Sequence, residues 1–112
     1  MIDEYKFGEI VVDGRVFTND IIIYPDHVEP KWWRKQGHVV EPEDITDVFD
    51  LGPEIIVFGT GQPGLMQVSS GTMAEMKRLR IEAMIMPTEQ ACSEYNNIAR
   101  TKKVVACLHL TC

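Results

Sequence analysis

Residues 54–66 read EIIVFGTGQPGLM and hold the feature that decides the fold, a glycine-rich turn directly after an apolar run. The run at 55–58 is uninterrupted, which is typical of a strand covered on both faces in a parallel sheet. Gly59, Gly61 and Gly64 then follow the spacing GxGxxG, which is also found in dinucleotide-binding turns. The stretch is therefore either a phosphate-binding turn or the turn that ends a buried strand.

The surroundings of these glycines disfavour a dinucleotide site. In such a site a helix begins inside the motif, so that its first amides meet the pyrophosphate. Here Pro63 lies in the motif, and the next helix start is at residues 69–72. An acidic residue should also end the second strand and bind the ribose, but Glu82 stands at the beginning of that strand. We interpret the glycines as the end of a parallel strand.

The remaining pattern predicts one α/β domain over residues 1–112. Residues 1–41 are interpreted as an antiparallel meander, with strands at 5–12, 15–18 and 21–24, followed by a tryptophan-rich loop. Asp13-Gly14 marks the first hairpin, because a type I′ turn needs positive φ at both central positions.

Residues 42–112 are interpreted as a helix followed by a β-α-β-α-β core, with strands at 55–58, 83–86 and 104–110. Pro42 suits a first helical position, Thr72 and Glu75 form a capping-box pattern, and Thr88 is a good N-cap. The expected fold class is a three-layer α/β fold, a small parallel βαβαβ sheet extended by the N-terminal meander. The second helix is expected to turn three side chains inward: Met73, Met76 and Leu79.

Two polar segments follow neighbouring parallel strands, where α/β sheets bind their ligands. Backbone amides of Gly59-Thr60-Gly61 and of Thr88-Glu89 could converge there on one anion or carbonyl. Alternatively, the glycines only permit a sharp turn and Thr88 only caps a helix. The candidate ligand pocket consists of Gly59, Thr60, Gly61, Arg34, His38, Thr88 and Glu89.

The loop before residue 41 supplies a second set of candidates. Trp32 and Trp33 lie outside a regular strand and need burial or a partner, so both are candidate partner-binding residues. Arg34 could bind an anion in a bidentate way, and His38 could carry a proton. In the alternative interpretation, one tryptophan covers the core, Arg34 stacks on it, and His38 is solvated.

Composition narrows the classes of function. The net charge of −6 disfavours binding to nucleic acid or to an anionic membrane, because both need clustered Lys and Arg. No apolar run approaches membrane-spanning length, and the first residues lack the pattern of a signal peptide. The three cysteines, Cys92, Cys107 and Cys112, are odd in number and lack metal-knuckle spacing. We therefore expect a reducing, cytoplasmic setting.

Catalytic motifs do not emerge from the chain. Ser69-Ser70 lacks the Gly-x-Ser-x-Gly elbow of a serine nucleophile, and neither a P-loop nor a zinc motif is present. We therefore assign no catalytic residue, no metal ligand and no cofactor from the sequence. Cys92 and Cys107 fall on apolar faces and are expected to be buried.

Taken together, the segments resemble the Mth-like domain family, which includes the adipogenesis-associated domain protein and a mitochondrial complex I assembly factor. The resemblance covers nearly the whole chain. It implies a three-layer α/β fold and no established activity or cofactor, while some relatives act through protein partners. The matching pieces are Trp33-Arg34, Gly37-His38, Gly59-Thr60-Gly61, Thr88-Glu89-Gln90-Ala91, Tyr95-Asn96 and Thr111-Cys112.

Two functional hypotheses follow. The first is a non-enzymatic binding or assembly module for an unidentified protein partner, with a pocket at the strand ends, an exposed apolar patch near Trp32-Trp33 and a possible homodimer. The second is a small enzyme or ligand-binding protein for an anionic metabolite. In it Arg34 would hold the negative group, the Gly59-Thr60-Gly61 amides would bind an oxyanion, and His38 or Glu89 would move protons.

Overall fold

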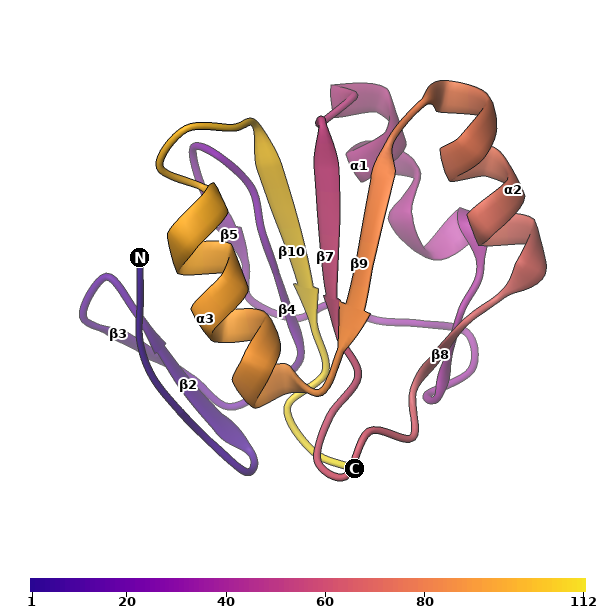
Figure 1. Ribbon diagram of the computed structural model, residues 1–112. Coiled ribbons are helices and arrows are strands. Elements are labelled where there is room, and N and C mark those ends of the chain that lie inside the picture. Colours follow the sequence, from indigo (N-terminus) through magenta and orange to yellow (C-terminus); the bar gives the residue numbers. More distant parts are fainter.

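A computed structural model, which describes residues 1–112, has the expected three-layer α/β architecture (Figure 1). The central sheet has the strand order β5-β4-β10-β7-β9. Strand β10 is parallel to β7, which is parallel to β9, and β4 is antiparallel to β10. The strands span Ile21–Ile23 (β4), Val28–Glu29 (β5), Ile55–Gly59 (β7), Glu82–Met86 (β9) and Val104–Leu108 (β10).

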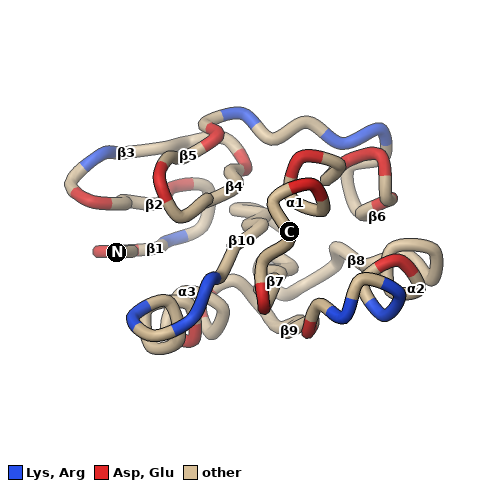
Figure 2. The backbone as a smooth tube through the Cα atoms, turned by 90° about the horizontal axis from the view of Figure 1, so that it is seen from above, with Lys and Arg blue, Asp and Glu red and all other residues tan.

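Different elements cover the two faces of this sheet. The meander and helix α3 pack on one face, while helix α2, the 3-10 helix η1 and helix α1 pack on the other (Figures 1 and 2). Helix α2 connects β7 to β9, and helix α3 connects β9 back to β10. Because these two connections cross the sheet in opposite directions, the two helices lie on opposite faces. The elements that cover the two faces span Ile2–Lys6 (β1), Glu9–Val12 (β2), Arg15–Phe17 (β3), Pro42–Ile45 (η1), Thr46–Leu51 (α1), Ser70–Leu79 (α2) and Thr88–Ile98 (α3).

Strand β10 shows why the apolar runs are continuous. Val104, Ala106 and Leu108 enter the core beneath α3 and the meander. Val105 and Cys107 enter the core beneath α1 and α2. Because side chains alternate along a strand, a strand covered on both faces needs apolar residues at every position.

The meander differs in two strands from the sequence-based expectation. Asp13 and Gly14 adopt φ of 48° and 79°, which confirms the predicted hairpin turn. A further turn at Gly8 (φ 83°) divides the expected strand at 5–12 into β1 and β2. The expected third strand, β4, instead joins the central sheet. All three residues of β4 are buried, and only the central sheet covers a strand on both faces.

Two helix starts also differ from expectation. Ser69, rather than Thr72, caps α2, and its hydroxyl oxygen accepts the Thr72 N–H at 3.1 Å. Pro87, rather than Thr88, is the N-cap of α3. Both threonines are fully buried, and their hydroxyls bond backbone carbonyls of other segments, Val40 and His109 respectively. Long-range contacts therefore replace the local capping role that the sequence favoured.

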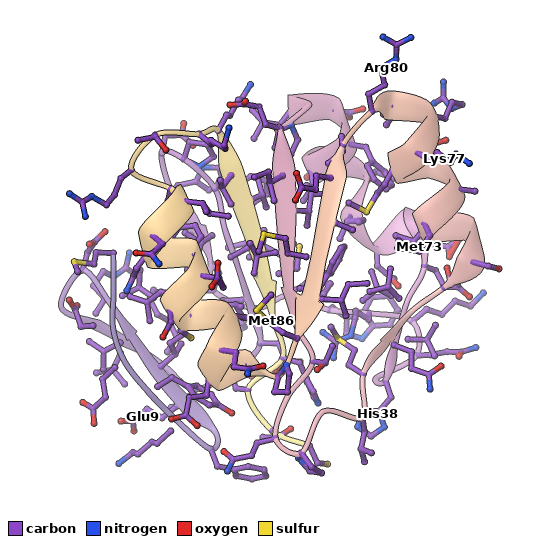
Figure 3. All side chains as sticks on the ribbon, viewed as in Figure 1. Glu9, His38, Met73, Lys77, Arg80 and Met86 are labelled. Atoms are coloured by element: carbon purple, nitrogen blue, oxygen red, sulfur yellow. The ribbon has the colours of Figure 1, made fainter.

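Helix α2 also presents a narrower apolar stripe than expected. Met76 is buried, whereas Met73 and Leu79 are 39% and 36% exposed. Figure 3 shows Met73 on helix α2, away from the central sheet. The helix packs beside the edge strand β9 and against η1, so only one line of its side chains reaches the core. The predicted inward orientation holds for Met76 and is wrong for the other two residues.

A short parallel pair, β6 (Val39–Val40) and β8 (Gln67–Val68), lies outside the central sheet. It joins the end of the tryptophan-rich loop to the chain that follows the glycine turn. No helix of the protein is long and apolar enough to cross a membrane. The charges are uneven, with acidic residues around β5 and α1 and basic residues near the ends of α2 and α3 (Figure 2).

Candidate functional site

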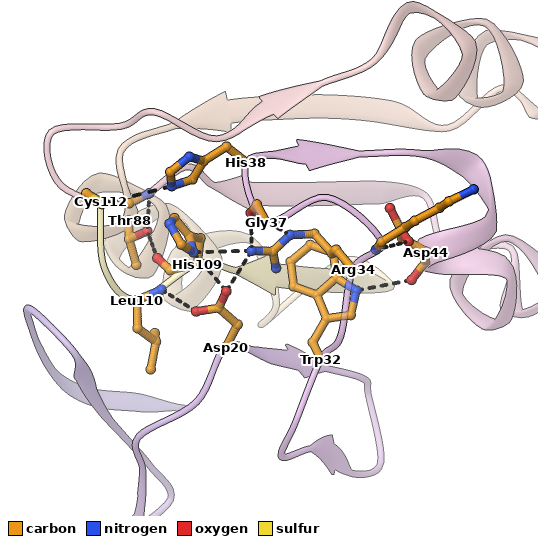
Figure 4. A network of polar contacts seen from close by, with 12 residues as sticks. Asp20, Trp32, Arg34, Gly37, His38, Asp44, Thr88, His109, Leu110 and Cys112 are labelled. Carbon is orange, nitrogen blue, oxygen red and sulfur yellow. Dashed lines mark hydrogen bonds and ion pairs between the residues drawn. The ribbon is translucent and has the colours of Figure 1, made fainter.

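A buried polar network lies at the carboxyl ends of the parallel strands (Figure 4). Its centre is Asp20, which precedes β4. The Asp20 carboxylate accepts hydrogen bonds from Arg34 Nη2, His109 Nδ1 and the Leu110 N–H, each at 2.8 Å. These partners come from the tryptophan-rich loop and from the segment after β10. The network therefore ties the tryptophan-rich loop and the start of β4 to the segment that follows β10.

The arginine of this network is sequestered. Only 4% of the Arg34 side chain is exposed. Its Cζ lies 4.4 Å from the ring centroid of Trp32, and its Nε donates to the Gly37 carbonyl at 3.0 Å. Trp32 is itself buried and donates to the Asp44 carbonyl at 3.1 Å. This is the arrangement in which one tryptophan covers the core and Arg34 stacks on it.

The surroundings of Asp20 stabilise its ionised form. Burial alone would raise the pKa of this carboxyl group, but hydrogen bonds from His109, the Leu110 amide and Arg34 outweigh burial and hold the pKa below its usual range. The guanidinium of Arg34 and the ionised carboxylate of Asp20 form a buried pair of opposite charges. Losing either side chain would leave the other charge buried without a partner.

The geometry also favours one tautomer of His109. Its Nδ1 lies 2.8 Å from the carboxylate of Asp20 and 3.3 Å from Arg34 Nη2. A carboxylate can only accept, so the shorter contact places the proton on Nδ1. Nε2 then carries no proton and can only accept a hydrogen bond, but this buried atom has no hydrogen-bond partner. Arg34 Nη1 is buried without a partner too.

The glycine turn lies beside this network, and its residues Gly59, Thr60 and Gly61 are buried. The Thr60 N–H donates to the Met86 carbonyl at 2.9 Å. The Gly61 N–H donates to Thr88 Oγ1 at 2.8 Å, and that hydroxyl donates to the His109 carbonyl at 2.6 Å. The N–H groups of Thr60 and Gly61, which the sequence suggests as oxyanion donors, thus already donate to acceptors within the protein. An anion at this position would have to displace those bonds.

Close packing explains the glycine at position 61. Gly61 has φ of 100°, which side chains rarely adopt. A Cβ there would collide with the Thr111 carbonyl oxygen and stand 2.7 Å from His109 Cδ2. The turn is pressed against the last residues of the chain, whose Thr111 carbonyl also accepts the Gln62 N–H at 2.8 Å.

Replacing Thr88 by valine should show how much the bridging hydroxyl contributes. Thr88→Val keeps the volume but leaves the Gly61 N–H and the His109 carbonyl unpaired in a buried place. We expect the free energy of unfolding to fall by about 2–3 kcal/mol. Urea unfolding at neutral pH measures the loss. Thr88→Ser keeps both hydrogen bonds and should lose clearly less; equal losses would contradict the assigned role.

The two remaining pocket candidates, His38 and Glu89, lie in different environments. His38 is exposed; its Nε2 lies 3.9 Å from Cys112 Sγ, and its ring meets that of His109 at 5.4 Å between centroids. Glu89 is exposed in the first turn of α3 and faces a depression that Met84 and Met86 also line. The network therefore gathers Arg34, Thr88 and the glycine turn, with His38 at its rim.

The two tryptophans differ in their exposure to solvent. Trp32 is 7% exposed, whereas Trp33 is 76% exposed. Trp33 borders a groove of about 630 Å³ between the β4–β5 hairpin and the η1–α1 segment. The groove is strongly acidic, with a single lysine, Lys31, among its lining residues. Its carboxylates are Asp26, Glu29, Asp44, Asp47 and Asp50.

Sequence reasoning missed the central residue of the network. Asp20 stands in an Asn-Asp turn pattern, and its partners Arg34, His109 and Leu110 lie 14, 89 and 90 positions away. Asn96 is a second such residue, which the sequence marks only through the family resemblance. Its side chain bonds both the N–H and the carbonyl of Ile2 at 2.8 Å, which fixes β1 against α3. Local patterns carry no signal for either role.

Comparison with known proteins assigns this α/β domain to a family. A family model described as a protein of unknown function (DUF498/DUF598) matches residues 2–109. The chain belongs to this family, which confirms the resemblance inferred from its sequence.

Solved structures agree with this assignment. A conserved hypothetical protein from Pyrococcus horikoshii is 24% identical with a TM-score of 0.86, covering 100% of this chain and 99% of its own. A protein described as MT938 is 25% identical with a TM-score of 0.79, at 100% and 98% coverage. A Bordetella pertussis protein described as a Mth938-like domain is 19% identical with a TM-score of 0.69, at 97% and 84% coverage. None of these descriptions names an activity.

Proposed function

We propose that this protein is a non-enzymatic binding module, and that the groove beside Trp33 holds a basic segment of a partner protein. One observation carries the proposal: a tryptophan that is 76% exposed at the edge of a groove with five carboxylates. Exposed tryptophans are enriched among the residues that dominate protein–protein binding energy. Here the ring would supply apolar contact, and the carboxylates would select Lys or Arg on the partner.

The charge of the groove supports this choice of partner. Lys31 is the one Lys or Arg among its lining residues, against five Asp and Glu. Burying so many carboxylates against a neutral or acidic surface would be costly, whereas a basic segment pairs with them. A second copy of this chain is a less suitable occupant, because its net charge is also −6. A homodimer therefore remains the weaker form of the proposal.

The alternative, a protein that binds or converts an anionic metabolite at the Gly59-Thr60-Gly61 loop, has less support. Arg34 is paired with Asp20, and the amides of Thr60 and Gly61 already donate to protein acceptors. A thermal-shift screen with small carboxylates and phosphates distinguishes it. A site occupied at a hundred times its dissociation constant would stabilise the protein by about 2.7 kcal/mol. The proposal expects no such shift.

Selection from a random dodecapeptide display library tests the binding proposal. Peptides enriched on the wild-type protein should contain several Lys or Arg next to an apolar residue. Trp33→Ala should weaken their binding about thirtyfold, the effect of losing a hot-spot contact of about 2 kcal/mol. The exposed carboxylates Asp47 and Asp50 give a second variant, D47N/D50N, which should bind more weakly and with a smaller dependence on salt.

Val16→Ala serves as the matched control, because Val16 is a 60% exposed apolar residue on β3, outside the residues that line the groove. It should bind the selected peptides as the wild type does. Selection of acidic peptides, or equal binding by Trp33→Ala, would rule the groove out as the binding site.

A further inference from the structure

The three cysteines differ sharply in their access to solvent. Cys107 is fully buried and Cys92 is 7% exposed. Burial raises the pKa of the Cys92 thiol to about 12, with Glu89 adding to the shift, and burial also raises the pKa of Cys107. Both thiols are therefore inert at neutral pH. Cys112 is partly exposed and unpaired, so it alone can meet a reagent from solution.

Cys112 also has a base beside it. Its Sγ lies 3.9 Å from Nε2 of His38, whose ring is exposed. Figure 4 shows Cys112 next to His38, with the ring of His109 below them. A thiol next to an imidazole can pass its proton to the ring, and the thiolate is the nucleophilic form.

A second, independent feature points to the same place. His109 is 5% exposed, and its Nε2 is buried without a hydrogen-bond partner. Its other nitrogen is held by Asp20, so the ring cannot easily turn to satisfy Nε2. The rings of His38 and His109 meet edge to face at 5.4 Å. An unpartnered proton acceptor is thus buried in the ring that packs against His38.

We propose that Cys112, with His38 as its base, forms a thiol–disulfide exchange site for small disulfides. The Cys112 thiol gives its proton to His38 Nε2, and the thiolate attacks one sulfur of the disulfide. A bond forms between Cys112 Sγ and that sulfur while the original S–S bond breaks. The other half leaves as a thiolate and takes the proton from His38. Cys112 is oxidised, and the departing sulfur is reduced.

The first test counts reactive thiols and measures their rate. Native protein is mixed with an aromatic disulfide that releases a coloured thiolate, and separately with glutathione disulfide, whose adduct is found by intact mass. One thiol of the three should react fast, and Cys112→Ser should remove it. A fast thiol that survives Cys112→Ser would overturn the assignment.

The second test isolates the role of His38 through pH. An isolated thiol is only a few per cent ionised at pH 7, so losing the base in His38→Gln should slow the reaction about tenfold there. Above about pH 9.5 an ordinary thiol ionises unaided, and the deficit should vanish. His27→Gln removes another exposed histidine and should change nothing. A pH-independent deficit, or none, would overturn the proposal, because a purely structural His38 would give one of those results.

Discussion

Gly61→Ala should lose about 4 kcal/mol of unfolding free energy, the largest effect that we expect from a single added methyl group. The added Cβ would force a residue with φ of 100° into a conformation that costs about 2 kcal/mol. It would also collide with the Thr111 carbonyl and press on His109 Cδ2 at 2.7 Å, adding about 2 kcal/mol of overpacking. Urea unfolding of the purified variant measures the loss.

Gly8→Ala separates these two contributions. Gly8 has φ of 83°, but an added Cβ would meet nothing within 4 Å. This variant therefore carries only the backbone term and should lose about 2 kcal/mol. If Gly61→Ala were no worse than Gly8→Ala, the close contact between the glycine turn and the end of the chain would not matter to stability.

Asp20→Asn should cost about 3 kcal/mol at pH 7. The carboxylate is the charged partner of Arg34, which is buried, and it also accepts from His109 and the Leu110 amide. The neutral amide cannot balance the buried guanidinium, and breaking a buried ion pair is strongly destabilising. The exposed Asp47→Asn removes one carboxylate without such partners and should stay within about 0.5 kcal/mol of wild type.

The same variant should remove part of the acid sensitivity. The pKa of Asp20 is lowered on folding, so the stability it contributes is complete above the pKa of the unfolded carboxyl, about 3.9. That stability is lost as pH falls through the lowered pKa of the folded state. The gap between wild type and Asp20→Asn should therefore narrow from pH 5 to pH 2.5. A constant gap would show that Asp20 is not the titrating group.

The three parallel strands of the central sheet could be predicted from the sequence because the signals for them are local. A strand covered on both faces needs apolar residues throughout, and the runs at 55–58 and 104–108 satisfy this without reference to the rest of the chain. The same rule, applied to Ile21-Ile22-Ile23, would have moved that strand out of the meander. Its place directly after the other meander strands favours the meander, whereas its own apolar pattern favours the central sheet.

The site was predictable only in part, because its contacts span the chain. The glycine turn, Arg34 and Thr88 were recognised as important positions, yet their partners are set by packing between distant segments. Thr88 looks like a helix cap, but its hydroxyl joins Gly61 to His109 across 27 and 21 positions. Likewise, nothing local distinguishes the buried Trp32 from the exposed Trp33.

Amide chemical-shift mapping with a basic peptide selected on the wild-type protein tests the central claim most directly. The claim is that the strand-end network is structural and that the partner binds beside Trp33. The account predicts shifts at Trp33, Lys31 and the residues around Asp47, with the amides of Gly61 and Leu110 unchanged. Shifts centred on Gly61 and Leu110, with Trp33 silent, would contradict it and return the binding site to the strand ends.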